Sequence, residues 1–293
     1  MNQYVVYSVI VGDIDNVRQP EVSDSRFDYI LFSDNIQRKK IGIWDVRPIP
    51  YDCENKRKLS RFPKCLPTKV LPEYKASLYM DANIQIATNL PYERTIELAE
   101  KQVSWAGMNH PDNIGVYEGM LNILNLGWVH DYEVLDWYCY LVRQGFMDKY
   151  NMFENNVIFR SHTPLVESIG EDWWNSMNKV TRDQFSLMYY LWKHDVPIVY
   201  FLPPTETIRF NTNNFIYTNH NPNKRVLKLG ILEDLRKRSW KESPRKDEYY
   251  GSNFAHFAKY KHPRFMLCLW GLGLTFLYGW KALYTVVKRK INR

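Results

Sequence analysis

An acidic residue and an amide residue, two positions apart, follow a short apolar run and form the most informative motif of the chain. The run is 76–80, and Asp81-Ala82-Asn83 comes directly after it. Oxygen ligands suit a hard cation such as Mn²⁺ or Mg²⁺, which keeps coordination places for phosphate. An ion that bridges a diphosphate would neutralise the charge that develops as a sugar–phosphate bond breaks. The alternative is that Asp81 and Asn83 only begin a turn.

A second acidic pair, Asp13-Ile14-Asp15, follows the first apolar run at 4–11. Its position after a strand also suits contact with a base or a ribose. We therefore expect nucleotide contact at Asp13 and metal binding at Asp81, with Asp13 and Asp15 as the alternative metal site.

The segments around these motifs alternate between short apolar runs and amphipathic stretches. Runs that are apolar on both faces are typical of parallel strands covered by helices, and the alternation predicts an open α/β sheet. Ligands of such sheets bind beyond the carboxyl ends of the strands, where both acidic motifs fall. The expected strands are 4–11, 27–32, 41–46, 76–80, 102–107 and 156–160, and the expected helices are 54–61, 91–101 and 130–144.

Thr181-Arg-Asp-Gln184 has the pattern of a capping box at the start of a further helix. The Thr181 hydroxyl would accept a hydrogen bond from the third helical amide, and Gln184 would reach back. A buried helical stripe would follow, formed by Phe185, Met188, Tyr189 and Trp192.

The charge of the chain is unevenly distributed around a net value of +7. Residues 224–293 contain 17 Lys and Arg against 5 Asp and Glu, whereas residues 1–223 contain 22 against 27. A nucleic-acid-binding protein usually carries its basic surface on the folded domain, so we expect no nucleic-acid partner. The basic excess instead favours docking of the C-terminal region on a membrane surface.

Residues 265–280 form a charge-free segment within this basic region. Sixteen residues fall short of the roughly 20 needed to span a bilayer. Trp270, Tyr278 and Trp280, with Lys281 beside them, resemble membrane-interface anchors. We expect an interfacial helix, with a core-packed helix and a true span as alternatives. The expected domains are 1–223, which is catalytic, and 224–293, which is basic and helical.

The cysteines indicate a reducing compartment. Cys53, Cys65, Cys139 and Cys268 show no Cys-x-x-Cys spacing, as is usual for free thiols. The apolar run 4–11 is too short for a span and lacks a basic region before it, so we expect a strand there and no signal peptide. The expected location is the cytoplasm, at the cytoplasmic face of the membrane.

The order of motifs over residues 4–195 resembles the glycosyltransferase-like family formerly described as domain of unknown function 616, the TOD/MUCI type. In the first half the matching motifs are Val11-Gly12-Asp13, Phe32-Ser33-Asp34, Arg61-Phe-Pro-Lys64 before Leu66-Pro67, and Met80-Asp81-Ala82-Asn83. In the second half they are His110-Pro111, Tyr117-Glu118, Glu154-Asn-Asn156 with Arg160, Trp173-Trp174, and Arg182-Asp183-Gln184. The chain departs from the family at Thr68, usually His, and at Asn113 and Gly115, where Arg and Cys are usual.

The resemblance implies a GT-A-like, Rossmann-related fold, a mostly parallel sheet flanked by helices, and a nucleotide-sugar donor, with a UDP-sugar favoured. It also implies a Mn²⁺ or Mg²⁺ cofactor. The implied donor-binding residues are Val11, Gly12, Asp13, Asp34, Arg61, Lys64, Asp81, Ala82, Arg160 and Gln184. The implied metal ligands are Asp81, Asn83 and His220, with His162 and His194 as alternatives for the third ligand. The implied catalytic residues are Asp183, Glu118 and His110.

Each of these roles has a structural alternative. Arg61 and Lys64 would offer positive charge to the diphosphate, or else belong to a solvated helix face. Asp183 would bind a sugar hydroxyl or assist attack at the anomeric carbon, or else only favour a helix N-terminus. His110 and Glu118 would bind the acceptor or supply a general base, or else His110 would be a structural histidine only.

The leading prediction is a glycosyltransferase with a lipid-linked or surface-glycan acceptor, as in the assembly of capsule or lipopolysaccharide. A non-catalytic nucleotide-sugar or glycan-binding module is the first alternative, because Asn83 stands in place of a second Asp. A metal-dependent phosphoryl or nucleotidyl transferase is the second, and the lack of a Walker-type glycine-rich loop argues against a P-loop enzyme.

Overall fold

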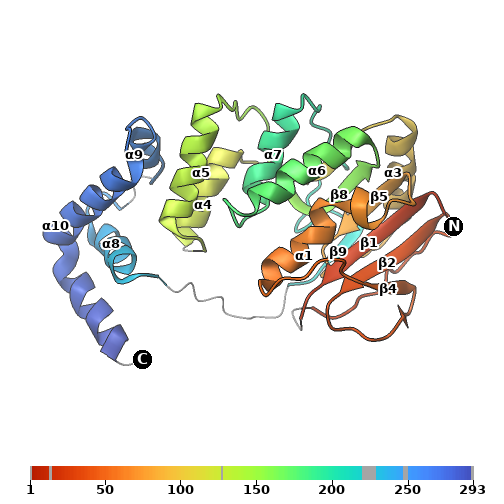
Figure 1. Ribbon diagram of the computed structural model, residues 1–293, viewed down its shortest axis with the longest axis horizontal. Helices are drawn as coiled ribbons and strands as arrows, with labels where there is room; N and C mark the ends of the chain where they lie inside the picture. Colours follow the sequence, from red (N-terminus) through yellow and green to blue (C-terminus); the bar gives the residue numbers. More distant parts are fainter. Residues whose placement is uncertain (1, 13–14, 127, 220–228, 247–249, 292–293) are drawn as a thin grey trace. The chain divides into compact units, whose positions relative to one another are not determined.

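The computed structural model describes residues 2–12, 15–126, 128–219, 229–246 and 250–291 (Figure 1). The chain divides into two compact units. Unit 1 comprises Met1–Val116 and Lys149–Asn223, and unit 2 comprises Tyr117–Asp148 and Lys224–Arg293. The C-terminal region therefore groups with Tyr117–Asp148, a segment expected from the sequence to belong to the first domain.

Unit 1 is built on a seven-stranded sheet of order β3-β4-β2-β1-β5-β8-β7. Its strands are β1 (Tyr4–Ile10), β2 (Phe27–Ser33), β3 (Lys40–Ile41), β4 (Trp44–Pro48), β5 (Ala76–Met80), β7 (Trp105–Asn109) and β8 (Phe153–Ser161). β1 pairs in parallel with β2 and β5, and β2 with β4, whereas β8 is antiparallel to both of its neighbours. A separate two-stranded sheet joins β6 (Ile84–Ile86) to β9 (Phe215–Tyr217). The mainly parallel α/β sheet predicted from the sequence is confirmed.

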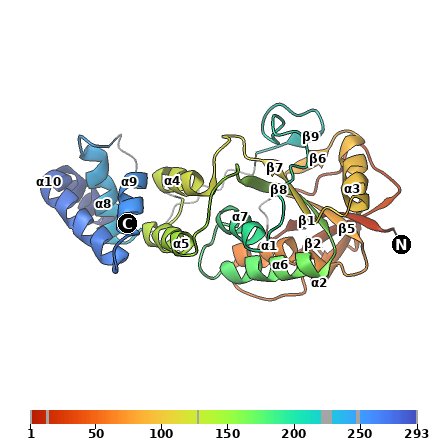
Figure 2. The same ribbon diagram turned by 90° about the horizontal axis from the view of Figure 1, so that it is seen from above.

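Helices cover both faces of this sheet. Those of unit 1 are α1 (Lys56–Cys65), α2 (Pro67–Val70), α3 (Leu90–Glu100), α6 (Pro164–Ser176) and α7 (Gln184–Lys193). Figure 2 shows α3 on one side of the sheet and α1, α6 and α7 on the other. Successive side chains of a strand point to opposite faces. The apolar cluster around α3 accordingly contains Leu78 and Met80 of β5, while Tyr79 between them contacts α1 through Lys64.

The sheet topology brings chemically useful residues to one edge. β1, β2 and β5 are parallel, so their carboxyl ends lie at the same edge, and the antiparallel β8 begins there. Gly12, Asp34 and Asp81 follow the three parallel strands, and Glu154 lies at the start of β8. The topology therefore positions the candidate site at the edge where ligands of α/β sheets bind.

Three local predictions differ from the structure. The strand expected at 41–46 is divided into β3 and β4, because Gly42 adopts a positive φ of 59° between them. The strand expected at 102–107 begins only at Trp105, since Gln102, with φ 56°, ends the preceding turn. The helix expected at 54–61 runs on to Cys65, through Pro63.

The capping-box prediction is wrong. Helix α7 begins at Gln184, and its N-cap residue Asp183 makes no side-chain capping hydrogen bond. Thr181 instead accepts a hydrogen bond from Arg57 of α1, and Gln184 donates to the Glu154 carbonyl of β8. The side chains of Thr181 and Gln184, which the capping box would have used, therefore form hydrogen bonds with residues far away in the sequence.

Unit 2 is helical in the residues that the structure describes. Its helices are α4 (Val116–Leu126), α5 (Asp131–Arg143), α8 (Ile231–Glu242), α9 (Tyr250–Phe257) and α10 (Pro263–Ile291). α8 packs along α10, with a small core of Leu235, Ala282 and Val286. α10 extends over 29 residues. Its stretch Pro263–Lys288 is long and apolar enough to cross a membrane by length and composition alone.

Candidate functional site

Helix α1 positions two cationic side chains, Arg61 and Lys64, at the carboxyl edge of the sheet. The Asn55 side chain caps its start by accepting from the Lys58 amide at 3.1 Å. Carbonyl groups at its other end are bound by core side chains: the Tyr7 hydroxyl donates to the Pro63 carbonyl at 3.2 Å, and Arg160 donates to the Lys64 carbonyl. The last turn of α1, which carries Lys64, is therefore fixed to the sheet.

A buried ion-pair network extends from this turn. Lys64 Nζ lies 2.8 Å from Asp183 Oδ2 and 3.5 Å from Asp81 Oδ1, and Arg61 Nε lies 3.5 Å from Asp183 Oδ1. The side chain of Lys64 is 2% exposed and that of Asp183 is 9% exposed. For Lys64 the solvated-face alternative is wrong, because the lysine sits between two carboxylates.

The environment of Asp183 keeps its carboxyl ionised. Burial alone would raise the pKa of Asp183, but Arg61 and Lys64 outweigh burial and hold that pKa well below its usual value. A carboxylate of such low basicity is a poor proton acceptor at neutral pH and a good hydrogen-bond acceptor. An ionised Asp183 is suited to accept a hydrogen bond from a hydroxyl or to face a positive charge, and is poorly suited to remove a proton.

Asp81 is the most exposed acidic member of the network. Its amide donates to the Asn156 carbonyl of β8 at 2.8 Å, which fixes the backbone just past the end of β5. Its carboxylate accepts from the Tyr79 hydroxyl at 2.6 Å and contacts Lys64, yet the side chain is 27% exposed. Asp81 also begins a turn, since the Ile84 amide donates to its carbonyl at 3.0 Å. Its carboxylate is therefore both anchored and accessible.

Asn83 supplies a second oxygen. Its Nδ2 donates to the Thr218 carbonyl at 2.7 Å, and its Oδ1 is buried with no hydrogen-bond partner among the described residues. An anchored carboxylate and an amide oxygen without a partner are the type of donor that Mn²⁺ and Mg²⁺ prefer, so these two residues fit the implied ion. No cluster of three or more His, Cys, Asp or Glu suited to a metal occurs in the part of the chain described, and His220 lies outside that part.

The two alternative histidine ligands lie elsewhere. His162 Nε2 is 2.9 Å from the hydroxyl of Ser77, which precedes Asp81 by about 13 Å along β5. His194 Nε2 is 3.0 Å from Asp172 Oδ2, just past the end of α7. Each histidine is therefore held by another partner, and neither forms a contact with Asp81 in the part of the chain that the structure describes.

Asp34 organises the loop after β1. Its Oδ1 accepts from the Gly12 amide at 2.8 Å, and its Oδ2 accepts from Lys56 Nζ at 2.6 Å. Burial would raise the pKa of Asp34, but these hydrogen bonds hold it below its usual value. Gly12 has a φ of +65°, a conformation that favours glycine. Asp13, the expected nucleotide contact, lies outside the described residues.

Most of the remaining donor-binding candidates are buried. Val11 and Ala82 are 3% and 9% exposed. Arg160 is fully buried, with its guanidinium 5.1 Å from the Trp105 ring and bound to the Tyr7 hydroxyl and the Lys64 carbonyl. Arg160 is expected from the sequence to contact the nucleotide-sugar donor directly, and the complete burial of its side chain does not agree with such a contact. Arg160 positions Lys64 instead.

A second ion pair at the same edge was missed from the sequence. Arg209 Nε lies 2.5 Å from Oε1 of Glu154, whose side chain is 2% exposed. Burial raises the pKa of Glu154, and Arg209 partly offsets that effect. Glu154 belongs to the family motif Glu154-Asn-Asn156, whereas Arg209 follows no recognisable pattern.

The start of β8 is irregular beside this pair. The register between β7 and β8 shifts between Gly107 and Asn109, and Asn155 adopts a φ of +60°. Bulges of this kind are frequent next to active sites, where they redirect side chains. The irregularity occurs beside Asn156, the residue whose carbonyl holds the Asp81 amide.

The expected acid–base residues have different surroundings. Burial lowers the pKa of His110 to about 4, and nearby Arg209 and Arg182 act in the same direction. His110 is therefore neutral at pH 7 and would form hydrogen bonds, with little capacity as a base. Glu118 is exposed on α4 and belongs to unit 2, so it is not among the residues that unit 1 brings together.

Comparison with known proteins places this site within a family. Residues 1–207 match the family model described as TOD1/MUCI70, glycosyltransferase-like domain, and no curated protein matches the chain. The match covers well over half of the 293 residues and includes the complete seven-stranded sheet and the Asp81–Lys64–Asp183 network. The chain belongs to the TOD1/MUCI70 glycosyltransferase-like family.

Proposed function

We propose that the chain is a glycosyltransferase that moves a sugar from a nucleotide-sugar donor, with a UDP-sugar favoured, and that depends on Mn²⁺ or Mg²⁺. The proposed acceptor is a lipid-linked or surface glycan at the cytoplasmic face of a membrane. The proposed fold is GT-A-like. The main support for this proposal is the partly exposed Asp81 carboxylate, which Lys64 and Tyr79 hold at the carboxyl end of the central strand β5.

The charge around Asp81 supports a donor that contains a diphosphate. Arg61 and Lys64 of α1, Lys56 beside Asp34, and Arg209 beside Glu154 all lie near the carboxyl edge of the sheet. Each of these cations is paired with a carboxylate, so they would offer hydrogen-bond donors to the phosphates, while the divalent ion would compensate most of the diphosphate charge. Arg61, 26% exposed, has more freedom to reach a phosphate than the buried Lys64.

The proposed ion would be held by Asp81 and by the Asn83 Oδ1 atom, which lacks a hydrogen-bond partner in the described structure. When bound, it would neutralise charge on the leaving diphosphate. Tyr79 and Lys64 would keep the Asp81 carboxylate oriented through Oδ1. His220 remains the proposed third ligand of the metal ion.

Asp183 and Lys64 would act on the sugar side. The low pKa of Asp183 means that the side chain is a carboxylate at neutral pH. A fixed negative charge would stabilise the oxocarbenium-like charge of glycosyl transfer, or bind a sugar hydroxyl. Lys64 would position both Asp183 and Asp81, because it contacts each carboxylate from a buried site.

Thermal stabilisation by a panel of nucleotide sugars, with and without Mn²⁺, tests the proposal. A ligand at a hundredfold excess over its Kd stabilises the folded protein by about 2.7 kcal/mol. We expect one donor class to stabilise the protein more with Mn²⁺, and Asp81→Asn to remove that increment. Asp45→Asn is the matched control, because Asp45 is exposed on β4 and pairs only weakly with Lys40 at 3.7 Å. An unchanged metal response in Asp81→Asn would contradict the proposed metal site.

A non-catalytic nucleotide-sugar or glycan-binding module is the second candidate. It is favoured by Asn83, whose amide is engaged with the Thr218 carbonyl, and by the lack of a three-residue metal cluster among the described residues. Donor binding without any turnover, over a broad range of acceptors, would support this candidate against the transferase.

A further inference from the structure

Helix α10 has two different long faces. Leu267, Leu274, Ala282 and Val286 are buried, and the last two pack with Leu235 of α8. The opposite face is a stripe of exposed apolar side chains that are spaced three or four residues apart, which is the repeat of one helix face. The apolar stripe comprises Phe265, Leu269, Leu272, Phe276, Trp280 and Leu283. Phe276 and Trp280 are 84% and 81% exposed, so large apolar side chains face outward over several turns.

The charges on α10 are of one sign. The helix carries Arg264, Lys281 and Lys288 and contains no acidic residue in its sequence. An exposed apolar stripe of this length marks an interaction surface. Basic residues beside an apolar face are typical of helices that bind a bilayer containing anionic lipids. The apolar face contacts the acyl chains, and the basic residues contact the anionic headgroups.

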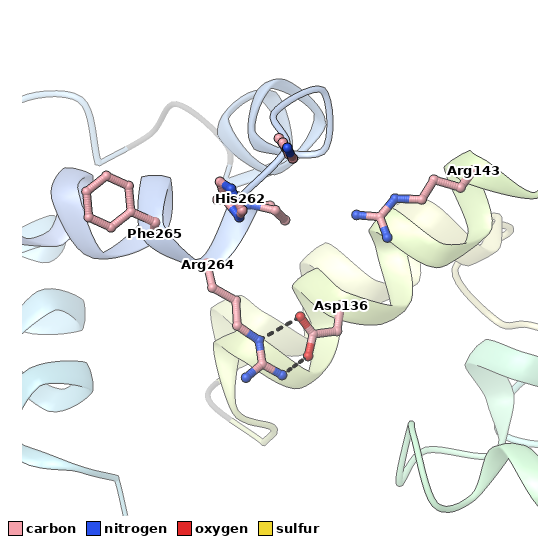
Figure 3. Close-up of a pocket in the computed structure, with 7 residues that line it drawn as sticks. Asp136, Arg143, His262, Arg264 and Phe265 are labelled. Atoms are coloured by element: carbon pink, nitrogen blue, oxygen red, sulfur yellow. Dashed lines mark hydrogen bonds and ion pairs between the residues drawn. The ribbon is translucent and has the colours of Figure 1, made fainter.

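An open cavity of about 620 Å³ lies where the apolar stripe begins. Arg143 of α5, Lys261, His262, Arg264 and Phe265 line it, with Asp136 as the acid among them (Figure 3). Arg264 Nε donates to Asp136 Oδ1 at 2.9 Å, and its Nη2 contacts Oδ2 of the same carboxylate. Asp136 is therefore neutralised by Arg264, and Arg143 and Lys261 have no acidic partner among the described residues.

We propose that this basic cavity binds the phosphate headgroup of an anionic lipid while the apolar stripe enters the outer acyl region. Phe265 joins the two features, because it lines the cavity and is also the first residue of the stripe. Arg143 and Lys261 supply the charge for the phosphate, and the stripe supplies the apolar contact. Unit 2 is therefore a lipid-binding module, and this assignment is independent of the chemistry of unit 1.

The packing of α8 favours a helix that lies on the membrane over one that crosses it. A Cβ atom at Gly271 would come within 2.6 Å of Arg236, and one at Gly279 would lie 3.4 Å from the hydroxyl of Ser239. Helix α8 thus covers the middle of α10. A spanning α10 would carry Arg236 and its charged neighbours on α8 into the hydrocarbon region, which is costly.

Vesicle flotation with the full chain tests the proposal. We expect binding to vesicles of phosphatidylglycerol and phosphatidylcholine, and much weaker binding to phosphatidylcholine alone. Raising the salt from about 0.1 to about 1 M, which shortens the Debye length from about 10 to about 3 Å, should weaken binding. Arg143→Ala with Lys261→Ala should weaken it roughly 30-fold, given the usual contribution of each basic residue. Lys40→Ala with Lys101→Ala, which removes the same charge from unit 1, should leave binding unchanged.

The apolar stripe has its own variant, Phe276→Ser with Trp280→Ser. It should abolish vesicle binding while circular dichroism and solubility remain those of the parent chain, since both side chains are exposed. Equal binding by the Arg143/Lys261 variant and the parent chain would overturn the cavity assignment. Protein that resists extraction by alkaline carbonate would overturn the interfacial placement in favour of a span. If the chain forms dimers that depend on Phe276 and Trp280 and does not bind vesicles, the apolar stripe is a contact with a second copy of the chain. If inorganic phosphate stabilises the protein and vesicles do not bind, the cavity is a site for free phosphate.

Discussion

Replacement of Lys64 by Met should destabilise unit 1 by about 3 kcal/mol. The Lys64 side chain is 2% exposed and lies 2.8 Å from Asp183, which is itself buried. Removing one partner of a buried ion pair usually costs about 3–5 kcal/mol, because the other charge is left uncompensated. Arg61 remains 3.5 Å from Asp183 and provides part of that compensation, so the lower end of the range applies. Met has a similar volume, so little of the loss should come from packing.

Hydrogen exchange against urea, followed by mass spectrometry on peptides from β1 and β5, would measure this loss within unit 1 alone. Asp183→Asn should also destabilise the unit. The double variant should lose less than the sum of the two single losses, by about 1–3 kcal/mol, because both changes remove the same interaction. A loss below about 1 kcal/mol for Lys64→Met, or strict additivity, would refute the ion-pair account.

Substitution of Gly170, substitution of Tyr79 and acidification each test a different feature of unit 1. Gly170→Ala should cost about 1–3 kcal/mol by overpacking, because its Cβ would lie 2.5 Å from the carbonyl at the end of α1; an unchanged unfolding midpoint would contradict this. Tyr79→Phe should cost about 1.5–3 kcal/mol by removing the 2.6 Å hydrogen bond to Asp81, and a neutral result in urea unfolding would show that the hydroxyl is dispensable. Burial lowers the pKa of His110 and of His162 to about 4, so below about pH 6.5 the unfolded chain binds protons that the folded chain does not. Stability should therefore decline from about pH 6.5 toward pH 4, and replacing both histidines by Asn should flatten that part of the profile.

The fold was predictable where one physical signal dominated. The run 76–80 is apolar on both faces, and it forms the central strand β5 with the bounds expected. The position of Asp81 at its end followed from the rule that ligands bind at the carboxyl ends of strands. The ordered motifs then indicated the family that the match over residues 1–207 shows.

The contacts within the site could not be predicted because they join residues far apart in the sequence. The pairing of Lys64 with Asp183 depends on how α1 and α7 pack on one face of the sheet, and no local pattern encodes it. Arg160 followed the family motif but lies at 0% exposure, because strand alternation turns it toward the end of α1. The capping box failed for the same reason, since tertiary partners took Thr181 and Gln184.

Product analysis of a nucleotide sugar incubated with the full chain, Mn²⁺ and candidate acceptors would test the transfer reaction proposed at Asp81. We expect release of nucleoside diphosphate together with transferred or hydrolysed sugar, and loss of this release in Asp81→Asn but not in Asp45→Asn. Release of nucleoside monophosphate and sugar phosphate would contradict it, as would a rate that Asp81→Asn leaves unchanged.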